Sequence, residues 1–263
     1  MSSPTSSLRR IWQSVFNDSL QFIDLYFSRR YPIAQTFTSE QDGHIVAQAQ
    51  CLPYTMTSAQ GQPSLRVGYV SGLATLPQYR GNGHATKVMN QMHQWLKEQH
   101  FDYCLLIPAD KKAEQWYTKH FDYRSGTGKH TFMVTASQIA QCTPLHQLSP
   151  HLIHIIRRDL ASSPYTVQHT TSDLRDQLTV CQMSGGGLYT LDGNIYFMAE
   201  KISTSKSEEI FRVLDLFANS REYQDPRTSL LPPHSLQPTT YMYLPICATP
   251  ALPDNLRITL MLD

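Results

Sequence analysis

The sequence has 263 residues, of which 41% are hydrophobic and 16% are charged, and this composition excludes an intrinsically disordered chain. Its 22 basic and 21 acidic side chains leave a formal net charge of +1, which argues against partners bound by overall charge, such as nucleic acid or an acidic membrane. The five cysteines form no Cys-x-x-Cys pair, as is typical of reduced thiols. With no secretory leader pattern and no apolar run of about 18–20 residues, we expect a cytoplasmic protein.

The first part of the chain predicts two helices followed by strands. Apolar residues recur at spacings of three and four over 8–16 and again over 20–27, which is the period of an amphipathic helix. Asp18 is the expected N-cap of the second helix, and Arg29 and Arg30 are expected at its solvated end, where cations suit the helix dipole. Strands are expected over 34–37, 45–52 and 65–76, with a hairpin turn at Gln41-Asp42-Gly43 between the first two.

The clearest unit of the sequence is a strand, a helix and a second strand. Residues 82–99 carry apolar side chains on one helical face, and residues 103–107 are almost continuously apolar, as in a strand buried on both faces. A glycine-rich turn opens the helix, so the order of these elements predicts a parallel βαβ unit. The fold class that we expect is therefore α/β with a mixed sheet.

The second half of the chain reads differently. After a helix over 113–119 and a strand over 131–135, the stretch 141–150 has two prolines and little periodicity, which favours a domain boundary. We expect an N-terminal domain over 1–142, able to bind its ligand alone, then a linker over 143–150 and a smaller C-terminal α/β domain over 151–263. Within the latter we expect helices over 152–160 and 208–219 and strands over 165–169, 178–183, 188–191, 194–202, 241–246 and 256–262.

The turn inside the βαβ unit has the chemistry of an anion site. Gln78-Tyr79-Arg80-Gly81-Asn82-Gly83 follows the strand and opens the helix. Glycines let backbone N–H groups approach an anion, a helix N-terminus adds partial positive charge, and arginine adds a fixed cation. The segment is neither a P-loop nor a Gly-x-Gly-x-x-Gly dinucleotide turn, so it predicts a pyrophosphate site of another type.

This turn resembles the Arg/Gln-x-x-Gly-x-Gly/Ala loop with which the GNAT N-acetyltransferase superfamily binds acetyl-coenzyme A (acetyl-CoA). The resemblance implies that the amides from Arg80 to Ala85 hold the cofactor pyrophosphate, and that the strand edge Leu73–Thr75 pairs with the pantetheine arm in a slot opened by splaying at Pro77. The implied cofactor-binding residues are Leu73, Ala74, Thr75, Gln78, Arg80, Gly81, Asn82, Gly83, His84 and Ala85.

A second segment resembles the same family. Residues 116–123, Trp-Tyr-Thr-Lys-His-Phe-Asp-Tyr, are similar to the family's Tyr-x-x-x-Gly-Phe stretch, whose tyrosine protonates the departing thiolate in many members. The resemblance implies Tyr117 as this catalytic acid. The sequence departs from the pattern at Asp122, where glycine is usual, and the spacing from Tyr117 is one residue longer. Because one residue rotates a helical side chain by about 100°, Tyr123 is the second candidate.

The rest of the chain is loosely similar to the second half of tandem acetyltransferases of the enhanced-intracellular-survival type, in which a degenerate GNAT-like domain follows the first. No second Arg-x-x-Gly-x-Gly loop follows residue 150, so we expect a single cofactor site. In some such proteins the terminal carboxylate acts as a base. Asp263 is the match for that role, although those chains carry an additional domain.

The expected function is transfer of the acetyl group of acetyl-CoA to a primary amine of a small molecule or peptide, by direct attack in a ternary complex. The amine arrives as ammonium, with a pKa near ~10.4, so a base must remove a proton; Glu40, His44 and Glu114 are candidates. A strand N–H near Ala74 or Thr75 would stabilise the attacked carbonyl. The alternative is a catalytically silent protein that binds or senses acyl-CoA. The histidines lack metal-ligand spacing, so no metal site is expected.

Overall fold

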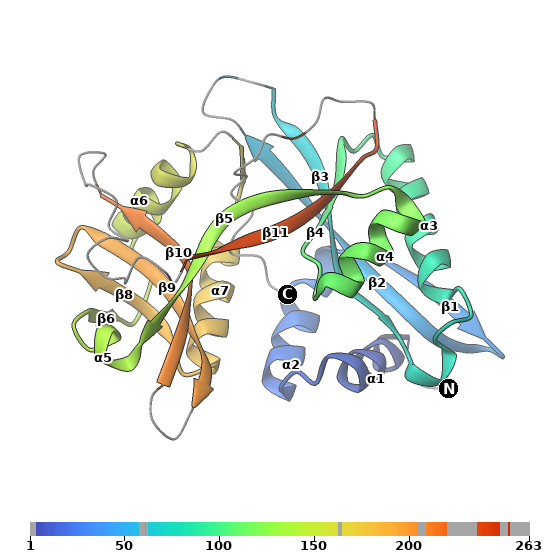
Figure 1. The fold of residues 1–263 in the computed structure, drawn as a ribbon, viewed down its shortest axis with the longest axis horizontal. Coiled ribbons are helices and arrows are strands. Elements are labelled where there is room, and N and C mark those ends of the chain that lie inside the picture. The colour runs from blue at the N-terminus through green and yellow to red at the C-terminus, as the bar shows by residue number, and fades with distance from the viewer. Residues whose placement is uncertain are drawn as a thin grey trace.

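The computed structural model describes residues 4–57, 61, 63–162, 165–204, 209–219, 236–247 and 252. Two lobes lie side by side, and two long strands, β5 (Arg124–Thr135) and β11 (Leu236–Pro245), run between them (Figure 1). We call the part built from α1–α4 and β1–β4 the N-terminal lobe. The part built from α5–α7, β6 and β8–β10 is the inserted lobe.

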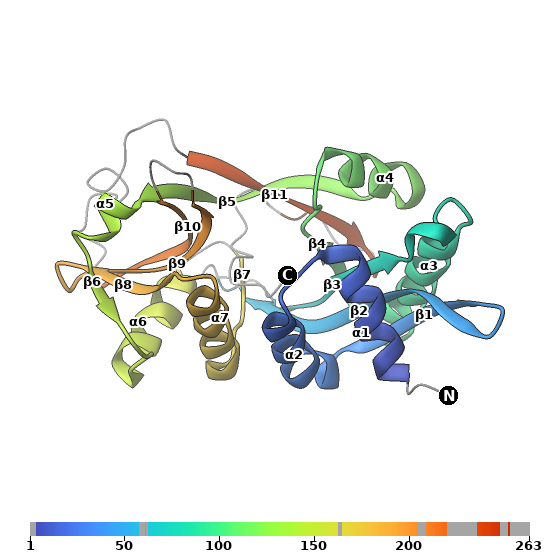
Figure 2. The same ribbon diagram turned by 90° about the horizontal axis from the view of Figure 1, so that it is seen from below.

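The N-terminal lobe is a sheet with helices on both faces. The helices α1 (Pro4–Phe16) and α2 (Leu20–Arg29) lie on one face, and α3 (His84–Glu98) and α4 (Lys111–Phe121) belong to the core on the other face (Figure 2). The strands are β1 (Gln35–Gln41), β2 (His44–Thr57), β3 (Leu65–Thr75) and β4 (Tyr103–Leu106), and the short 3-10 turns are η1 (Tyr31–Ile33) and η2 (Pro77–Tyr79). In this sheet β3 lies between β2 and β4.

The predicted hairpin and βαβ unit are both confirmed. β1 pairs antiparallel with β2, and β3 pairs in parallel with β4 after the crossover through α3. One detail differs, since Ser19 rather than Asp18 caps α2 by accepting a hydrogen bond from the Phe22 N–H. Asp18 is engaged elsewhere, because it accepts a hydrogen bond of 2.7 Å from Trp12 Nε1.

The strand β11 returns to the N-terminal lobe from the far end of the chain. It lies between β4 and β5 and is antiparallel to both, so that Met242 pairs with Leu106 on one side and with Ser125 on the other. Met242 is fully buried there. The inserted lobe is thus a segment between β5 and β11. The expected division into 1–142 and 151–263 does not describe β11, because the sheet of the first lobe needs this strand as a partner.

The inserted lobe continues the same sheet. Its elements are α5 (Ala136–Ile139), β6 (Thr143–Leu145), α6 (Pro150–Leu160), α7 (Thr171–Met183), β8 (Gly187–Leu191), β9 (Ile195–Thr204) and β10 (Glu209–Ala218). From β5 the strands follow in the order β10, β9, β8 and β6, all antiparallel, with α6 and α7 packed on one face. β6 falls inside the expected linker 143–150, so that stretch is part of the lobe. The two-residue strand β7 (Thr166–Val167) instead pairs with β2.

Residues 178–183, expected as a strand, are the second half of α7. Thr170 and Asp173 form a capping box that starts this helix, and the buried Leu178 and Cys181 continue its helical spacing. A run as short as 178–183 does not by its periodicity distinguish a strand from a buried helix. The capping box outweighs that local propensity.

Residues 208–219, expected as an amphipathic helix, form the strand β10. Phe211, Val213 and Phe217 are buried, and β10 pairs with β5 and β9 on its two sides. The register shifts between Val213 and Asp215, and this irregularity gives the apolar positions an apparent helical spacing. Tertiary pairing therefore decides the conformation of this segment.

Two expectations lie outside the described residues, namely the strand over 256–262 and the carboxylate role of Asp263. Among the helices in the described ranges, none has the length and apolar composition needed to cross a bilayer.

Candidate functional site

β3 and β4 separate after their first paired residues, and we call the unpaired edge of β3 beyond that point the slot. The two strands are paired only as far as Tyr69 and Leu105. β3 then continues to Thr75, whereas β4 ends at Leu106, and no other strand in the described ranges pairs with this side of β3. The separation begins well before Pro77, so the expectation that this proline opens the slot is wrong. The early end of β4 opens it.

A β-bulge shapes β3 beside this slot. Between the pairs Gln48–Ala74 and Gln50–Ser71, β3 has one residue more than β2. The bulge contains Gly72, whose φ of +63° is a conformation that side chains avoid. An isolated glycine inside a strand pattern is the sequence signal for such a bulge, and Gly72 is a site residue absent from the predicted set.

The register after the bulge determines which amides of β3 face the slot. The Leu76 N–H donates to the Val46 carbonyl on β2, and peptide groups alternate between the two sides of a strand. Ala74 therefore also faces β2, and its side chain packs under α1. The N–H groups of Leu73 and Thr75 face the slot. Of the expected strand-edge residues, Leu73 and Thr75 are placed for pairing there, and Ala74 is not.

The turn after β3 leads into a helix N-terminus that no side chain caps. Gly83 occupies the N-cap position of α3 with φ +78° and makes no capping bond, whereas α2, α4, α6 and α7 each begin with a side chain that does. The first hydrogen bond of α3 runs from the Lys87 N–H to the Gly83 carbonyl. The N–H groups of His84, Ala85 and Thr86 consequently have no partner within the helix, which is the arrangement that binds an anion.

Both glycines of the turn leave room for such an anion. Gly81 and Gly83 have φ of +83° and +78°, and a Cβ built on either would meet nothing within 4 Å. Asn82, between them, is exposed. Glycine is needed here for backbone conformation and not for packing, and the open space lets a diphosphate reach the amides. The turn therefore fits the pyrophosphate of a coenzyme.

Two polar side chains fasten the turn to the sheet. Arg80 Nε donates a hydrogen bond of 3.2 Å to the Thr75 carbonyl, which holds the guanidinium at the open end of the slot. The imidazole of His84 contacts Ser39 Oγ through Nδ1 at 2.9 Å and Gln41 Oε1 through Nε2 at 3.0 Å. Because both ring nitrogens are engaged with β1, only the backbone amide of His84 is available to a ligand.

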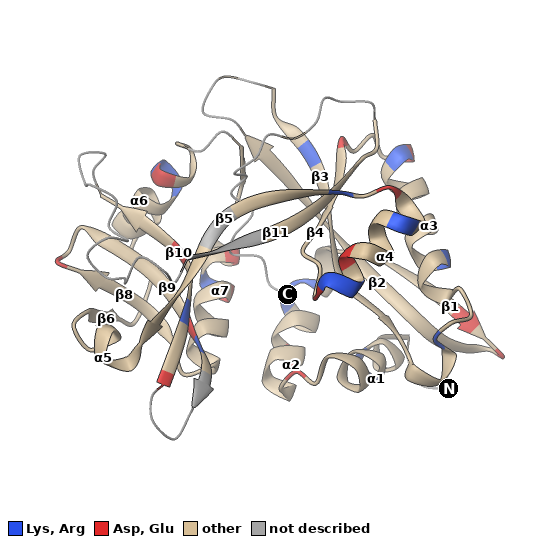
Figure 3. Ribbon diagram, viewed as in Figure 1, with Lys and Arg blue, Asp and Glu red and all other residues tan. Residues whose placement is uncertain are grey.

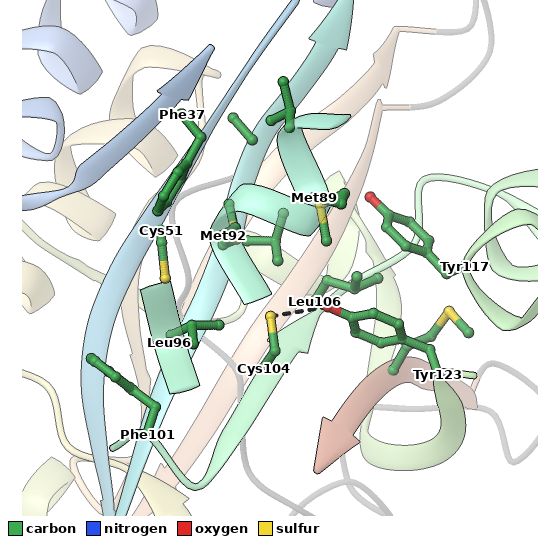
Figure 4. Packing of buried hydrophobic residues seen from close by; sticks show 14 of the residues in the cluster. Phe37, Cys51, Met89, Met92, Leu96, Phe101, Cys104, Leu106, Tyr117 and Tyr123 are labelled. Carbon is green, nitrogen blue, oxygen red and sulfur yellow. Dashed lines mark hydrogen bonds between the residues drawn. The ribbon is translucent and has the colours of Figure 1, made fainter. Parts of the chain in front are cut away.

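Tyr117 lies on the inner side of α4, in the core between α3 and the sheet. It is 8% exposed and belongs to one cluster with Met89 and Leu106, and in Figure 4 its hydroxyl points toward Met89. In the described part of the chain this hydroxyl has no hydrogen-bond partner. Burial chiefly, and then the nearby Cys104, raise the pKa of Tyr117 above its ordinary value. The phenol is thus protonated at neutral pH and free to donate to a ligand.

Asp122 takes the backbone conformation of the glycine that it replaces in the family pattern. It lies at the C-cap of α4 with φ +59°, and its N–H bonds to the Thr118 carbonyl. This left-handed conformation is the usual place for glycine after a helix, and aspartate is among the residues that tolerate it. The departure from the pattern therefore does not disturb the end of α4.

Tyr123, the second candidate acid, is committed to the core. It is 1% exposed, and its hydroxyl donates to Cys104 Sγ at 2.9 Å (Figure 4). His93 Nε2 lies 3.0 Å from the same oxygen. Burial lowers the pKa of His93 from 6.5 to about 4, so the neutral imidazole can donate to Tyr123 while Tyr123 donates to the thiol. With both its hydrogen-bonding roles filled, Tyr123 is poorly placed to protonate a ligand.

The three candidate bases have different surroundings. Glu114 is bonded to Lys111 Nζ at 2.7 Å and to Ser125 Oγ at 2.8 Å, and these two bonds lower its carboxyl pKa, which weakens it as a base. Glu40 is exposed on β1. His44 lines a cavity of about 550 Å³ beside α1, together with Arg10 and Gln78 among others. Gln78, expected at the pyrophosphate, thus faces this cavity.

Residues 3–125, just under half of the chain, match the family model of an acetyltransferase (GNAT) domain. The N-terminal lobe is therefore a GNAT acetyltransferase domain, as its turn and βαβ unit predict. The comparison with curated proteins finds no significant match.

Solved structures extend the likeness across both lobes. A protein from Enterococcus faecalis V583 described as a probable N-acyltransferase is 11% identical with a TM-score of 0.68, over 93% of this chain and 70% of that one. A GCN5-related N-acetyltransferase from Anabaena variabilis is 14% identical with a TM-score of 0.64, over 94% and 71%. Eis1 from Mycobacterium abscessus is 16% identical with a TM-score of 0.56, over 84% and 58%. The predicted tandem arrangement is confirmed as a fold.

Proposed function

We propose that this chain, whose N-terminal lobe is a GNAT domain, is an N-acetyltransferase that moves the acetyl group of acetyl-CoA to a primary amine of a small molecule or peptide. One observation carries the proposal: a free strand edge and an uncapped helix N-terminus occur at the two ends of the same segment, 73–85. A pantetheine arm pairs with a strand edge, and a diphosphate binds unpaired amides. The segment offers both in the order in which a coenzyme would need them.

The residues of the slot then have distinct parts in the reaction. The amine nitrogen attacks the thioester carbonyl carbon, the C–S bond breaks, and the thiolate takes up a proton. The Leu73 N–H stabilises the oxygen that gains charge, an effect of about 3–4 kcal/mol for a single donor. Tyr117 gives its proton to the thiolate, and the proton that the amine nitrogen loses as the amide forms restores the Tyr117 phenol through solvent. Bound acetyl-CoA supplies the activated acetyl group.

A single charge placed in the turn tests the binding mode. Asn82→Asp adds a carboxylate beside the expected pyrophosphate, and repulsion at a few ångströms should weaken acetyl-CoA binding by about tenfold or more in calorimetry at low salt. The same carboxylate near the N-terminus of α3 is favourable to the helix, so the melting temperature should hold or rise. Asn90→Asp, an exposed position later in α3, is the matched control and should leave binding unchanged. Equal affinities for the two variants would refute this binding mode.

Thiol release separates the transferase from a silent acyl-CoA-binding protein. With acetyl-CoA and a panel of primary amines, the proposal expects free CoA thiol to appear only when an amine is present. Binding in calorimetry without thiol release for any amine would instead support the silent alternative.

A further inference from the structure

The two lobes are joined by a buried cluster of charge between α2 and α7. Arg30, which follows α2, forms an ion pair with Asp173, and its Nη2 lies 3.5 Å from Asp176 Oδ2. The three side chains are only 3%, 8% and 9% exposed. Asp173 also accepts a hydrogen bond of 2.6 Å from the Thr170 N–H, as part of the capping box of α7. Arg30 was expected at a solvated helix end, and it is instead fixed to the first turn of a helix in the other lobe.

This cluster does not have the composition that stability alone would favour. Arg30 faces two carboxylates, and Arg29 is a further cation near Asp176. Among the described residues, neither Arg30 Nε nor Asp176 Oδ2 has a hydrogen-bond partner, although both atoms are buried. Replacing a buried ion pair with apolar residues is often neutral or stabilising, whereas such pairs can fix the position of the elements that carry them. The cluster therefore sets where α2 lies relative to α7 more than it adds to the free energy of folding.

A second contact of α2 leads to the β3 bulge beside the slot. One turn before Arg30, Tyr26 is 1% exposed, and its hydroxyl donates a hydrogen bond of 2.9 Å to Ser71 Oγ on β3. The Tyr26 ring also packs on Trp12, with centroids 4.3 Å apart, and Trp12 covers the bulge at Gly72. Leu73 is the second residue of this bulge, and its N–H faces the slot.

We propose that Arg30 is a positioning residue for the transfer reaction. Through Arg30 the inserted lobe holds α2 in place, and α2 in turn holds Tyr26 and the β3 bulge so that the Leu73 N–H faces the slot. The inference rests on the proposed function. It assigns the inserted lobe a part in catalysis that does not require it to touch acetyl-CoA.

Conservative variants and a matched control test this coupling. Arg30→Lys keeps the charge and loses the forked contact to two carboxylates, so kcat should fall by about ten- to a hundredfold while the calorimetric Kd for acetyl-CoA changes less than about twofold. Tyr26→Phe should lower kcat and leave the Kd nearly unchanged in the same way. The double variant should have a kcat no lower than that of the more impaired single variant, because both substitutions interrupt the same chain of contacts. Arg212→Lys, which alters an ion pair with Glu200 inside the inserted lobe, should change neither value.

Hydrogen exchange provides a readout that needs no activity. Mass spectrometry of the segment 71–76 should show faster exchange in Arg30→Lys than in the unaltered protein or in Arg212→Lys. If Arg30→Lys does not fold, Asp176→Asn, which removes one of the two carboxylates facing Arg30 and keeps the Arg30–Asp173 pair, should also speed exchange in the segment 71–76. Unchanged exchange together with independent, multiplying effects on kcat would overturn the inference. Absence of transfer by the unaltered protein would refute the proposed function alone, because the exchange comparison would still stand.

Discussion

Replacing Gly72 with alanine tests the packing beneath the β3 bulge. A Cβ at this position would overlap the Trp12 ring and lie 2.6 Å from Gln50 Oε1, and the backbone has φ +63°. The left-handed conformation costs an alanine about 1–2 kcal/mol, and overpacking a filled site costs a further ~1–3 kcal/mol. Gly72→Ala should therefore lower the free energy of unfolding by about 2–5 kcal/mol, measured by urea denaturation followed by far-UV circular dichroism.

The hairpin glycine Gly43 provides the control for the backbone part of this cost. Its φ is +75°, but a Cβ there would meet nothing within 4 Å. Gly43→Ala should therefore show only the conformational loss of about 1–2 kcal/mol. If Gly72→Ala were no more destabilised than Gly43→Ala, Trp12 and Gln50 would have moved aside, and the claim that α1 fixes the bulge would be refuted.

Three further predictions concern the core, the acid and the pH. A fragment ending at residue 145 lacks β10 and β11, which leaves β5 without a partner strand and one edge of β4 unpaired, so it should aggregate and bind no acetyl-CoA; a folded fragment that binds it in calorimetry would contradict this. Tyr117→Phe should slow turnover by about tenfold or more and leave the Kd for acetyl-CoA nearly unchanged, whereas loss of binding would reject its role as an acid. Burial lowers the pKa of His93 from 6.5 to about 4, so the unfolded chain binds the proton more tightly. As the pH is lowered from 6.5 to about 4, the free energy of unfolding should therefore fall by up to about 3 kcal/mol. In His93→Gln this part of the pH dependence should be absent when the free energy of unfolding is measured by urea denaturation.

The site was largely predictable where its signals are local. The turn 78–83 carries its own chemistry, since the glycines and the arginine are adjacent in sequence and the flanking patterns identify a strand and a helix. The bulge at Gly72 had a local signal too. Its partner Trp12 did not, because no spacing in the sequence indicates that a residue of the first helix lies against a strand sixty positions later.

The remaining misassignments depend on contacts between distant segments. Arg30 resembles an ordinary cationic helix end until α7 supplies two carboxylates to cover it. The apolar residues of 208–219 fit a helical period, and only pairing with β5 and β9 makes that segment a strand. The return of β11 between β4 and β5 likewise has no local signature, because any apolar strand of that length could occupy any edge of the sheet.

The place of the insertion explains how the two lobes share one sheet while the slot stays open. β11 supplies the partner that β4 needs on the side away from β3, so β4 can be short, and can separate from β3 beyond Leu105, without leaving both of its edges unpaired. The same strand comes from the end of the chain, after the inserted lobe. The strands beside the slot are therefore complete only when the chain has passed through the inserted lobe and β11 pairs with β4. The pairing of Leu106 with Met242 closes a long loop, and the entropic cost of closing a loop grows only slowly with its length. The slot that we propose for the coenzyme therefore forms only together with the inserted lobe.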